Sequence, residues 1–472
     1  MVSNGTRKQR HAATNNETAF IRQEDAPILP PPITSAGPAG WLYENIFASM
    51  LDYSTLGAAV KSILMAIFTA FVAYIFVGQV YGLLDFAIFS AVWQDPEEQK
   101  RQVCWTVEQG GKLPNGWHGA CWPYIIAKTK FILYGAYPNE SLWRVNSTYL
   151  LGAILLGWVM IDRLPYRKFV GAVLLTIYPI FATVMLTGGG FGLSQFSVGV
   201  NTILGLALIS FGRAGKMGWI TGPLLDLSKV AGVAGWFFIF FAAALVSVGV
   251  DFDLSKVDTR DWGGLLITLV VATTAIVVSL PLGILLALGR RSNLPVARTL
   301  SIIFIEFWRG VPLITVLFMA SVMIPLFMPE GVNFDSLLRA LIGVTLWQSA
   351  YMAEVIRGGL QAIDKGQYEG ADAVGLSYWQ SMRLIILPQA LTRVLPGIVN
   401  TIISVFKDTS LVSIVGLFDL LGATQSTIAD AAWSTPVQAS TGYLVVALIF
   451  FVFCFGMSRY SMYIERKLDR GH

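Results

Sequence analysis

The chain is short of charge. Asp, Glu, Lys and Arg make up 13% of its 472 residues, whereas hydrophobic residues make up 55% and the mean hydropathy is +0.62. Soluble domains carry about 25% charged residues, so the composition excludes an ordinary soluble domain and predicts an all-α integral membrane protein. The net charge of +4 is small, and no basic stripe alternates with aromatic residues, so nothing points to nucleic acid.

Residues that perform catalysis or bind metals are also scarce. Three cysteines and three scattered histidines exclude a Cys/His metal cluster. Both Gly-Lys pairs lack the hydroxyl that a phosphate-binding loop places beside Mg²⁺, because Lys112 is followed by Leu113 and Lys216 by Met217. The chain therefore has no catalytic candidate and no means of hydrolysing ATP alone. Paired carboxylates and nucleophile elbows are missing too, which argues against a membrane enzyme.

Apolar runs long enough to cross a bilayer recur along the chain. Lys and Arg gather after every second run, which places those loops and both termini in the cytoplasm. We expect a disordered cytoplasmic tail in residues 1–56, a membrane extension in 57–250 and a five-helix core in 262–465. The ten predicted spans are 58–84, 147–161, 169–186, 198–211, 231–250, 265–288, 300–327, 337–355, 391–415 and 443–457.

A large loop at about residues 87–147 is predicted to be periplasmic. It holds Cys104 and Cys121, which in that oxidising compartment form a candidate disulfide worth about 3 kcal/mol. Two free thiols are the alternative. Cys454 lies inside the last apolar run and is expected to pack against its neighbours.

One polar stretch between two apolar runs reads EGADAVGLSYWQSMRLIILP. Asp364 with Gln367, and Ser377 with Gln380, are spaced as capping boxes. Gly375 stands between them, where it is placed to end the first helix. We expect two short helices joined by a glycine bend, too polar to span the bilayer. Surrounding basic residues predict a cytoplasmic position, which suits a docking element.

This stretch resembles the coupling loop of ABC-importer permeases, whose pattern is Glu-Ala-Ala, three residues, Gly, nine residues and Ile-x-Leu-Pro. Here Glu369, Gly370 and Ala371 are followed by Gly375 and by Ile-Ile-Leu-Pro at 385–388, with every spacing kept. Gly370 departs from the pattern. Glycine weakens the helix by about 1 kcal/mol but keeps the volume small. The alternative is an ordinary loop between membrane helices.

The last five spans are similar to the core of polar amino-acid ABC permeases. The N-terminal half looks like the long permease subunit of general or glutamate/glutamine/aspartate/asparagine uptake systems. The resemblance implies a bacterial inner-membrane importer subunit that binds no cofactor itself. Two ATP-binding-cassette subunits would hold ATP and Mg²⁺, a second, homologous permease would complete the pore, and a periplasmic amino-acid-binding protein would deliver substrate.

The same resemblance places the ATPase contact in the loop 358–388. Small residues would allow close approach there, and carboxylates offer charge-assisted hydrogen bonds. Alternatively, the first carboxylate of the motif only caps its own helix or pairs with Arg393. The candidate coupling residues are Tyr368, Glu369, Gly370, Ala371, Asp372, Gly375 and Pro388.

Charged residues inside a span are costly and usually face a cavity or one another. Lys407, Asp408, Thr409 and Ser410 lie in the phrase FKDTSLVSIVGL, which also resembles polar amino-acid permeases. The motif supplies one group of each sign for a zwitterion, so it is a candidate for the substrate path. A Lys–Asp pair that only stabilises the helix is the alternative.

Two further acid–base pairs stand three residues apart, on one helical face. Glu306 and Arg309 either line the path or, as we favour, hold a helix break through a mutual salt bridge. Glu354 and Arg357 are expected to brace the coupling loop.

A stand-alone secondary transporter or channel explains the spans and buried charges equally well. It leaves the bent loop unexplained, and it predicts an internal repeat that residues 58–250 and 262–460 do not show. We therefore expect an importer subunit.

Overall fold

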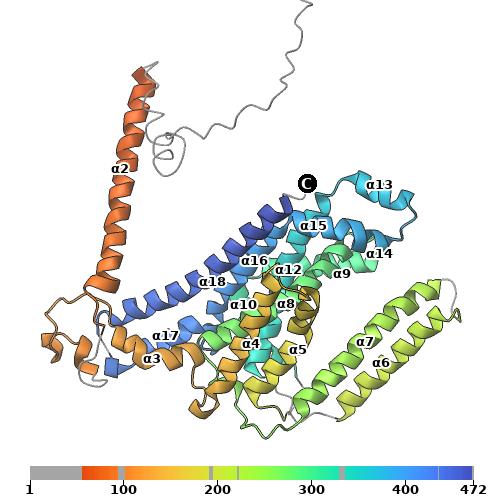
Figure 1. Ribbon diagram of the computed structural model, residues 1–472, viewed down its shortest axis with the longest axis horizontal. Helices are drawn as coiled ribbons and strands as arrows, with labels where there is room; N and C mark the ends of the chain where they lie inside the picture. Colours follow the sequence, from red (N-terminus) through yellow and green to blue (C-terminus); the bar gives the residue numbers. More distant parts are fainter. Residues whose placement is uncertain are drawn as a thin grey trace, which may run out of the picture. The chain divides into compact units, whose positions relative to one another are not determined.

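The computed structural model is built from helices (Figure 1). The chain divides into two compact units, Met1–Asp85 and Phe86–His472. The predicted division near residues 250–262 therefore falls inside the second unit. The predicted tail lies outside the described residues, except for Leu56. The structure describes residues 56–93, 101–190, 195–219, 223–328, 335–433 and 435–469.

The first unit contributes helix α2 (Leu56–Leu84), which has 29 apolar-rich residues. From Leu64 onward its side chains are almost all exposed. A long helix with an apolar, uncovered surface needs lipid around it. It coincides with the first predicted span.

The second unit begins with short turns and five helices that precede the core. Helices α6 and α7 run side by side (Figure 1). A Cβ on Gly212 would lie 2.6 Å from the Cα of Gly232, so only glycine permits this approach of the two backbones. The five helices are α3 (Trp122–Tyr134), α4 (Leu142–Met160), α5 (Arg167–Thr187), α6 (Gln195–Lys216) and α7 (Pro223–Gly249).

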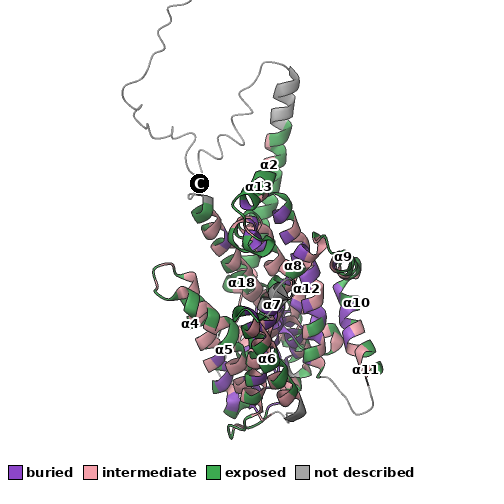
Figure 2. Cartoon of the chain, turned by 90° about the vertical axis from the view of Figure 1, so that its right-hand side faces the viewer, coloured by how far each residue is buried: buried purple, intermediate pink, exposed green. Residues whose placement is uncertain are grey.

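Buried residues in the core gather on α8, α10 and α12 (Figure 2). Helices α8 and α12 pack so closely that a Cβ on Gly283 would lie 2.8 Å from the Cβ of Met352. The core helices are α8 (Leu265–Arg290), α9 (Pro295–Gly310), α10 (Leu313–Phe318), α11 (Ile324–Leu326), α12 (Ser336–Gln361), α16 (Leu395–Asp408), α17 (Leu420–Ile428) and α18 (Gln438–Asp469).

The predicted span 300–327 contains the expected helix break, because the chain bends by 104° between α9 and α10. Val311 is extended at this point, and Pro312 follows it. A residue before proline is pushed out of the helical region, and proline itself offers no N–H.

Two short helices escaped the sequence analysis. Helix α3 lies inside the predicted periplasmic loop and packs against α8, α17 and α18. Helix α17 follows Asp419, whose side chain accepts hydrogen bonds from the backbone N–H groups of Leu421 (3.1 Å) and Gly422 (2.9 Å). Both helices are too short to span a bilayer, so a search for long apolar runs passes over them.

The described residues hold seven helices that are long and apolar enough to cross a membrane, or eight when the bent pair counts as one span. Helices α4 and α12 occupy two further predicted spans, but they do not meet that test of length and composition. The multi-pass helical architecture is thus confirmed, and the number of ten stays a prediction.

The turn between α4 and α5 is fastened to the end of α18. Asp162 receives hydrogen bonds or ion pairs from Arg167 (2.5 Å), Lys467 (2.9 Å) and the Tyr463 hydroxyl (2.5 Å). The Tyr463 hydrogen bond, with the two cations, lowers the pKa of Asp162 to about 2. This contact joins the region before the core to the last helix of the chain.

Candidate docking surface and charge network

Helix α13 (Lys365–Ala373) forms where the sequence predicts the first docking helix. It ends at Gly375, which has φ +74° and whose N–H donates to the Asp372 carbonyl at 3.0 Å. Glycine adopts this left-handed conformation without steric cost. The second predicted capping box also forms, since the Ser377 N–H donates to Gln380 Oε1 at 2.9 Å.

The first predicted capping box is wrong. The Asp364 side chain makes no capping hydrogen bond. Gln367 uses its Oε1 to accept from Gln389 Nε2 at 3.0 Å, and Asp364 lies 3.8 Å from Arg393 Nη2. Both partners belong to α15 (Leu387–Arg393), so these side chains fasten α13 to the next helix instead of capping it.

The second docking helix continues past Pro388. It begins as α14 (Tyr378–Ser381), widens into a π turn at Met382–Ile386 and continues as α15 to Arg393. Pro388 stands at the start of α15, directly after the widened turn, where its missing N–H is tolerated.

Helix α13 is held from behind by its tyrosine. Arg291 Nη1 donates to Tyr368 Oη at 3.0 Å and to the Leu360 carbonyl at 2.7 Å, and the guanidinium lies 5.5 Å from the Tyr368 ring centroid. Ala371 is 1% exposed. A cavity of about 230 Å³ lies beneath the helix, lined in part by Arg291, Tyr368, Asp372, Tyr378 and Ser381.

The other face of α13 is uncovered. Glu369 and Asp372 are exposed, and the position of a Cβ on Gly370 is open space. Among the described residues Glu369 makes no ion pair, and Arg393 pairs with Asp364 instead of Glu369. The helix therefore presents the Glu369 carboxylate and a small residue to solvent on its uncovered face, while Asp372, one turn after Tyr368, is exposed beside the anchored face.

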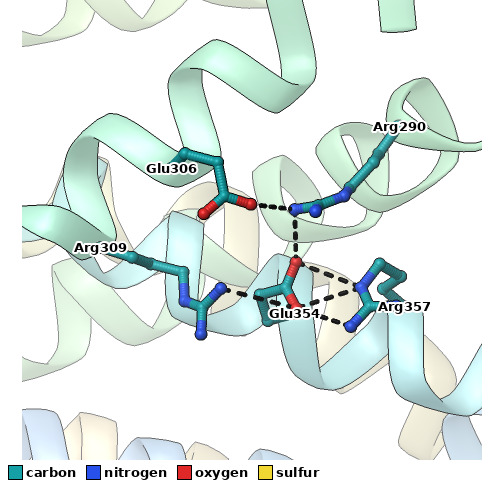
Figure 3. A network of polar contacts seen from close by, with 5 residues as sticks. All are labelled: Arg290, Glu306, Arg309, Glu354 and Arg357. Atoms are coloured by element: carbon teal, nitrogen blue, oxygen red, sulfur yellow. Dashed lines mark hydrogen bonds and ion pairs between the residues drawn. The ribbon is translucent and has the colours of Figure 1, made fainter.

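Five charged side chains meet where α8, α9 and α12 come together (Figure 3). Glu354 is their centre: it accepts from Arg290 at 2.7 Å and from Arg357 at 2.9 Å, and it lies 3.6 Å from Arg309. Arg290 also lies 2.8 Å from Glu306. The Glu354–Arg357 pair thus forms, whereas Glu306 and Arg309 do not pair with each other as predicted. Each has a partner on another helix.

Arg290 and Arg291 are among the basic residues that follow every second apolar run, which by their position indicate only a cytoplasmic loop. In the structure these neighbours point to different places: Arg290 to Glu354 in the charge network, Arg291 to Tyr368 on α13. The signal was present, since a pair of arginines ends α8. Their partners lie more than sixty residues away, so spacing alone did not reveal the contacts.

Two polar residues of α12 support the bend between α9 and α10 and the packing of α16. Trp347 Nε1 donates to the Val311 carbonyl at 3.0 Å, which satisfies a group freed by the bend. Gln348 is 1% exposed and donates to the Thr401 carbonyl at 3.0 Å. Both contacts are structural.

The Lys407–Ser410 motif marks the place where α16 gives way to a 3₁₀ segment, Thr409–Val415. Lys407 is exposed and, within the described chain, forms no ion pair with Asp408, which accepts from Ser404 at 3.4 Å. Thr409 is fully buried. None of the ion pairs and hydrogen bonds described above joins this motif to the network around Glu354.

At the far end of the second unit, Cys104 and Cys121 are joined in a disulfide. Both are buried, in a cluster with Tyr124 and Trp433. The Tyr124 hydroxyl lies 2.7 Å from Thr427 Oγ1. The stretch before the core is therefore packed onto α17 and the segment that follows it.

Two relatives match most of the chain. The inner membrane amino-acid ABC transporter permease protein YhdY of Escherichia coli (strain K12) is 45% identical over 75% of this chain and 79% of its own. The glutamate/glutamine/aspartate/asparagine transport system permease protein BztC of Rhodobacter capsulatus is 40% identical over 97% and 100%. The chain belongs to the amino-acid ABC transporter permeases.

The model of the family described as binding-protein-dependent transport system inner membrane component matches residues 279–470 of this permease. A solved structure described as an amino acid ABC transporter with histidines is 29% identical, covering 43% of this chain and 92% of that one with a TM-score of 0.39. A permease of this family is a multi-pass inner-membrane transport subunit and not an enzyme. It works with separate ATPase subunits, which handle ATP, and with a substrate-binding protein.

Proposed function

We propose that this chain is the longer permease subunit of an importer for acidic amino acids and their amides: glutamate, glutamine, aspartate and asparagine. The observation that carries the proposal is the 40% identity to BztC, which extends over the whole of that protein and 97% of this chain. The printed name of BztC gives these four substrates. YhdY, named only as an amino-acid permease, agrees with the class.

Helix α13 is proposed as the element that docks an ATPase subunit. Its uncovered face offers Glu369 for charge-assisted hydrogen bonds, the exposed Asp372 beside the anchored face offers a second carboxylate, and Gly370 leaves room for close approach. Its other face is fixed by Tyr368 against Arg291. Because α13 is fixed on one side, a movement of the docked ATPase subunit is transmitted through Tyr368 and Arg291 to the rest of the permease.

One predicted coupling loop serves one ATPase, so a second, homologous permease supplies the other loop of a heterodimer with two ATPases. ATP and Mg²⁺ bind to those ATPases. Both termini of this chain are cytoplasmic, on the side of α13. A periplasmic amino-acid-binding protein delivers substrate at the side of the Cys104–Cys121 disulfide.

The substrate path is proposed to run along α16 at Lys407, Asp408, Thr409 and Ser410. These residues supply charges of both signs and two hydroxyls where the helix changes its geometry. Glu306 and Arg309 hold the inner end of the path through the network around Glu354.

Charge reversal on α13 tests the docking proposal. In a complex purified through a tag on this chain, Glu369→Arg should release the ATPase subunits, because it places a cation where the partner expects a carboxylate. The matched control is Glu108→Arg, since Glu108 is also exposed but lies near the disulfide. Retention of the ATPase by Glu369→Arg would overturn the assignment of α13.

Competition experiments test the substrate class. Uptake of labelled glutamate into proteoliposomes that hold the whole complex should fall when unlabelled aspartate, glutamine or asparagine is added on the binding-protein side. Lysine and leucine serve as controls and should compete at least tenfold more weakly. Inhibition by lysine alone would contradict the proposed substrates.

A further inference from the structure

Arg144 is buried without a countercharge. It is 1% exposed, and Nη2 makes one long hydrogen bond, 3.3 Å to Ser255 Oγ, while Cζ lies 6.0 Å from the Tyr137 ring centroid. Nη1 is sealed from solvent and has no hydrogen-bond partner. Arginine stays protonated in proteins, and a buried charge left unpaired is strongly destabilising. The buried guanidinium therefore calls for an anionic partner.

The start of helix α4 adds a second source of positive potential. Arg144 stands in the first turn of this helix of 19 residues. Ser141 precedes it at the N-cap position but makes no capping hydrogen bond; its Oγ lies 3.0 Å from Ser255 Oγ. A helix N-terminus favours negative charge, so it repels the Arg144 cation and attracts an anion to the same place.

Ser255 belongs to an acidic segment, residues 251–261, whose carboxylates do not pair with Arg144. Asp251 accepts from the N–H of Asp253 at 3.0 Å, and Asp258 accepts from the N–H of Arg260 at 2.9 Å. From this segment, Ser255 is the residue that contacts the Arg144 guanidinium. Among the described residues, no carboxylate forms an ion pair with Arg144.

We propose that Arg144, Ser141 and Ser255 bind a halide ion, chloride in the cell, at the N-terminus of α4. The guanidinium is a donor, and so is one of the two hydroxyls, because the other donates within the Ser141–Ser255 hydrogen bond; an anion beside them satisfies Nη1. Arg144 and Ser141 are sealed, whereas Ser255 is exposed and marks the side of entry. A monatomic ion fits such a site with the least displacement, while a carboxylate or phosphate requires the site to open.

The ion would stabilise the junction between the extension and the core. Tyr137, beside Arg144, donates its hydroxyl to the Leu186 carbonyl at 3.0 Å, and both residues belong to the hydrophobic cluster that includes Trp262 and Leu266 of the core. A ligand that binds only the folded state raises its stability with concentration. Chloride should therefore strengthen this packing.

The unfolding temperature of the full-length permease in nanodiscs tests the proposal. Chloride is titrated against gluconate at constant ionic strength. We expect a saturable rise with chloride, a similar rise with bromide, and none with glutamate or phosphate. Arg144→Gln should abolish the response, and Ser255→Ala should raise the half-saturating chloride concentration severalfold. Arg260→Gln is the matched control, because Arg260 is an exposed arginine of the same segment.

Equal unfolding temperatures in chloride and gluconate would overturn the proposal, as would an unchanged chloride response in Arg144→Gln or a rise with glutamate or phosphate only. If Arg144→Gln does not fold, anomalous scattering from a bromide-soaked crystal decides with the native chain. A peak beside Arg144 Nη1 supports the site, and its absence contradicts it.

Discussion

The polar groups of two regions have opposite surroundings: the docking loop, residues 358–388, and the cap, the segment 104–124 that holds the Cys104–Cys121 disulfide. On α13, Glu369 and Asp372 are exposed, while Tyr368 and Gln367 fasten the helix to Arg291 and to α15. In the cap, Cys104 and Cys121 are buried and the neighbouring hydroxyls pair with the core. A surface that binds a moving partner leaves its polar groups available for that partner. A surface that must hold its shape satisfies its polar groups through contacts within the chain. The predictions below test this contrast.

The largest effect is expected where the docking loop bends. Gly375→Val places a β-branched residue at φ +74°, which costs about 1–2 kcal/mol and tilts α13 away from its partner. ATP-driven uptake in proteoliposomes should fall about tenfold or more. Gly366→Ala is the control, because Gly366 lies in α13 with open space around it and no positive φ. Normal uptake by Gly375→Val would show that the bend is not needed.

Loss of the disulfide in the cap should lower the stability of the permease but leave ATPase binding unchanged. Cys104→Ser removes a disulfide that closes a loop with a sequence separation of 17 residues, and the free energy of unfolding should drop by about 3 kcal/mol. Chemical unfolding in detergent measures the change, and Cys454→Ser is the control because Cys454 is a free thiol. Release of the ATPase by Cys104→Ser would contradict the proposal that the cap contributes to stability and not to ATPase binding.

Removal of either carboxylate of the charge network should destabilise the permease, but by different amounts for Glu354 and Glu306. Glu354→Gln leaves Arg290, Arg309 and Arg357 without their shared partner, at an expected cost of about 2 kcal/mol. Glu306→Gln removes one contact of a side chain that is 53% exposed, which should cost less than about 1 kcal/mol. Unfolding free energies of both variants test the order. Equal losses would contradict the central position of Glu354.

Two aspartates outside the spans should give pH effects of opposite sign, the smallest we expect. The pKa of Asp162 is lowered to about 2, so its stabilisation is present above about pH 4 and is lost as the pH falls toward 2. Burial raises the pKa of Asp419 to about 6, so stability declines as the pH rises from about 4 to 6. Unfolding temperatures from about pH 2 to 7 should show that Asp162→Asn removes only the loss of stability below about pH 4, and that Asp419→Asn removes only the decline above it. Profiles that match the native chain would contradict both assignments.

Features that depend on near neighbours in the chain were predictable. Gly375 ends α13, and Ser377 with Gln380 opens α14, because both involve residues within one turn. The family and the membrane architecture followed from fixed spacing and from long apolar runs. The failures involve distant partners. Gln367 is drawn to Gln389 and leaves Asp364 without its expected box.

The site shows the same limit. Glu306 and Arg309 have the right spacing for a pair, yet Arg290 and Glu354 from other helices compete for them. No local pattern announces Arg144 as an unpaired cation, since its burial follows from segments far apart in the sequence. Helices α3 and α17 were missed because a length criterion for spans ignores short helices.

The most direct test of the central claim is uptake of labelled glutamate into liposomes that contain this chain and its second permease subunit, with the binding protein present and with or without the ATPase subunits. We predict uptake only when both the ATPase and ATP are supplied, and its loss in Glu369→Arg. Uptake driven by an ion gradient in liposomes that lack the ATPase would contradict the account of this chain as an ATP-driven importer subunit.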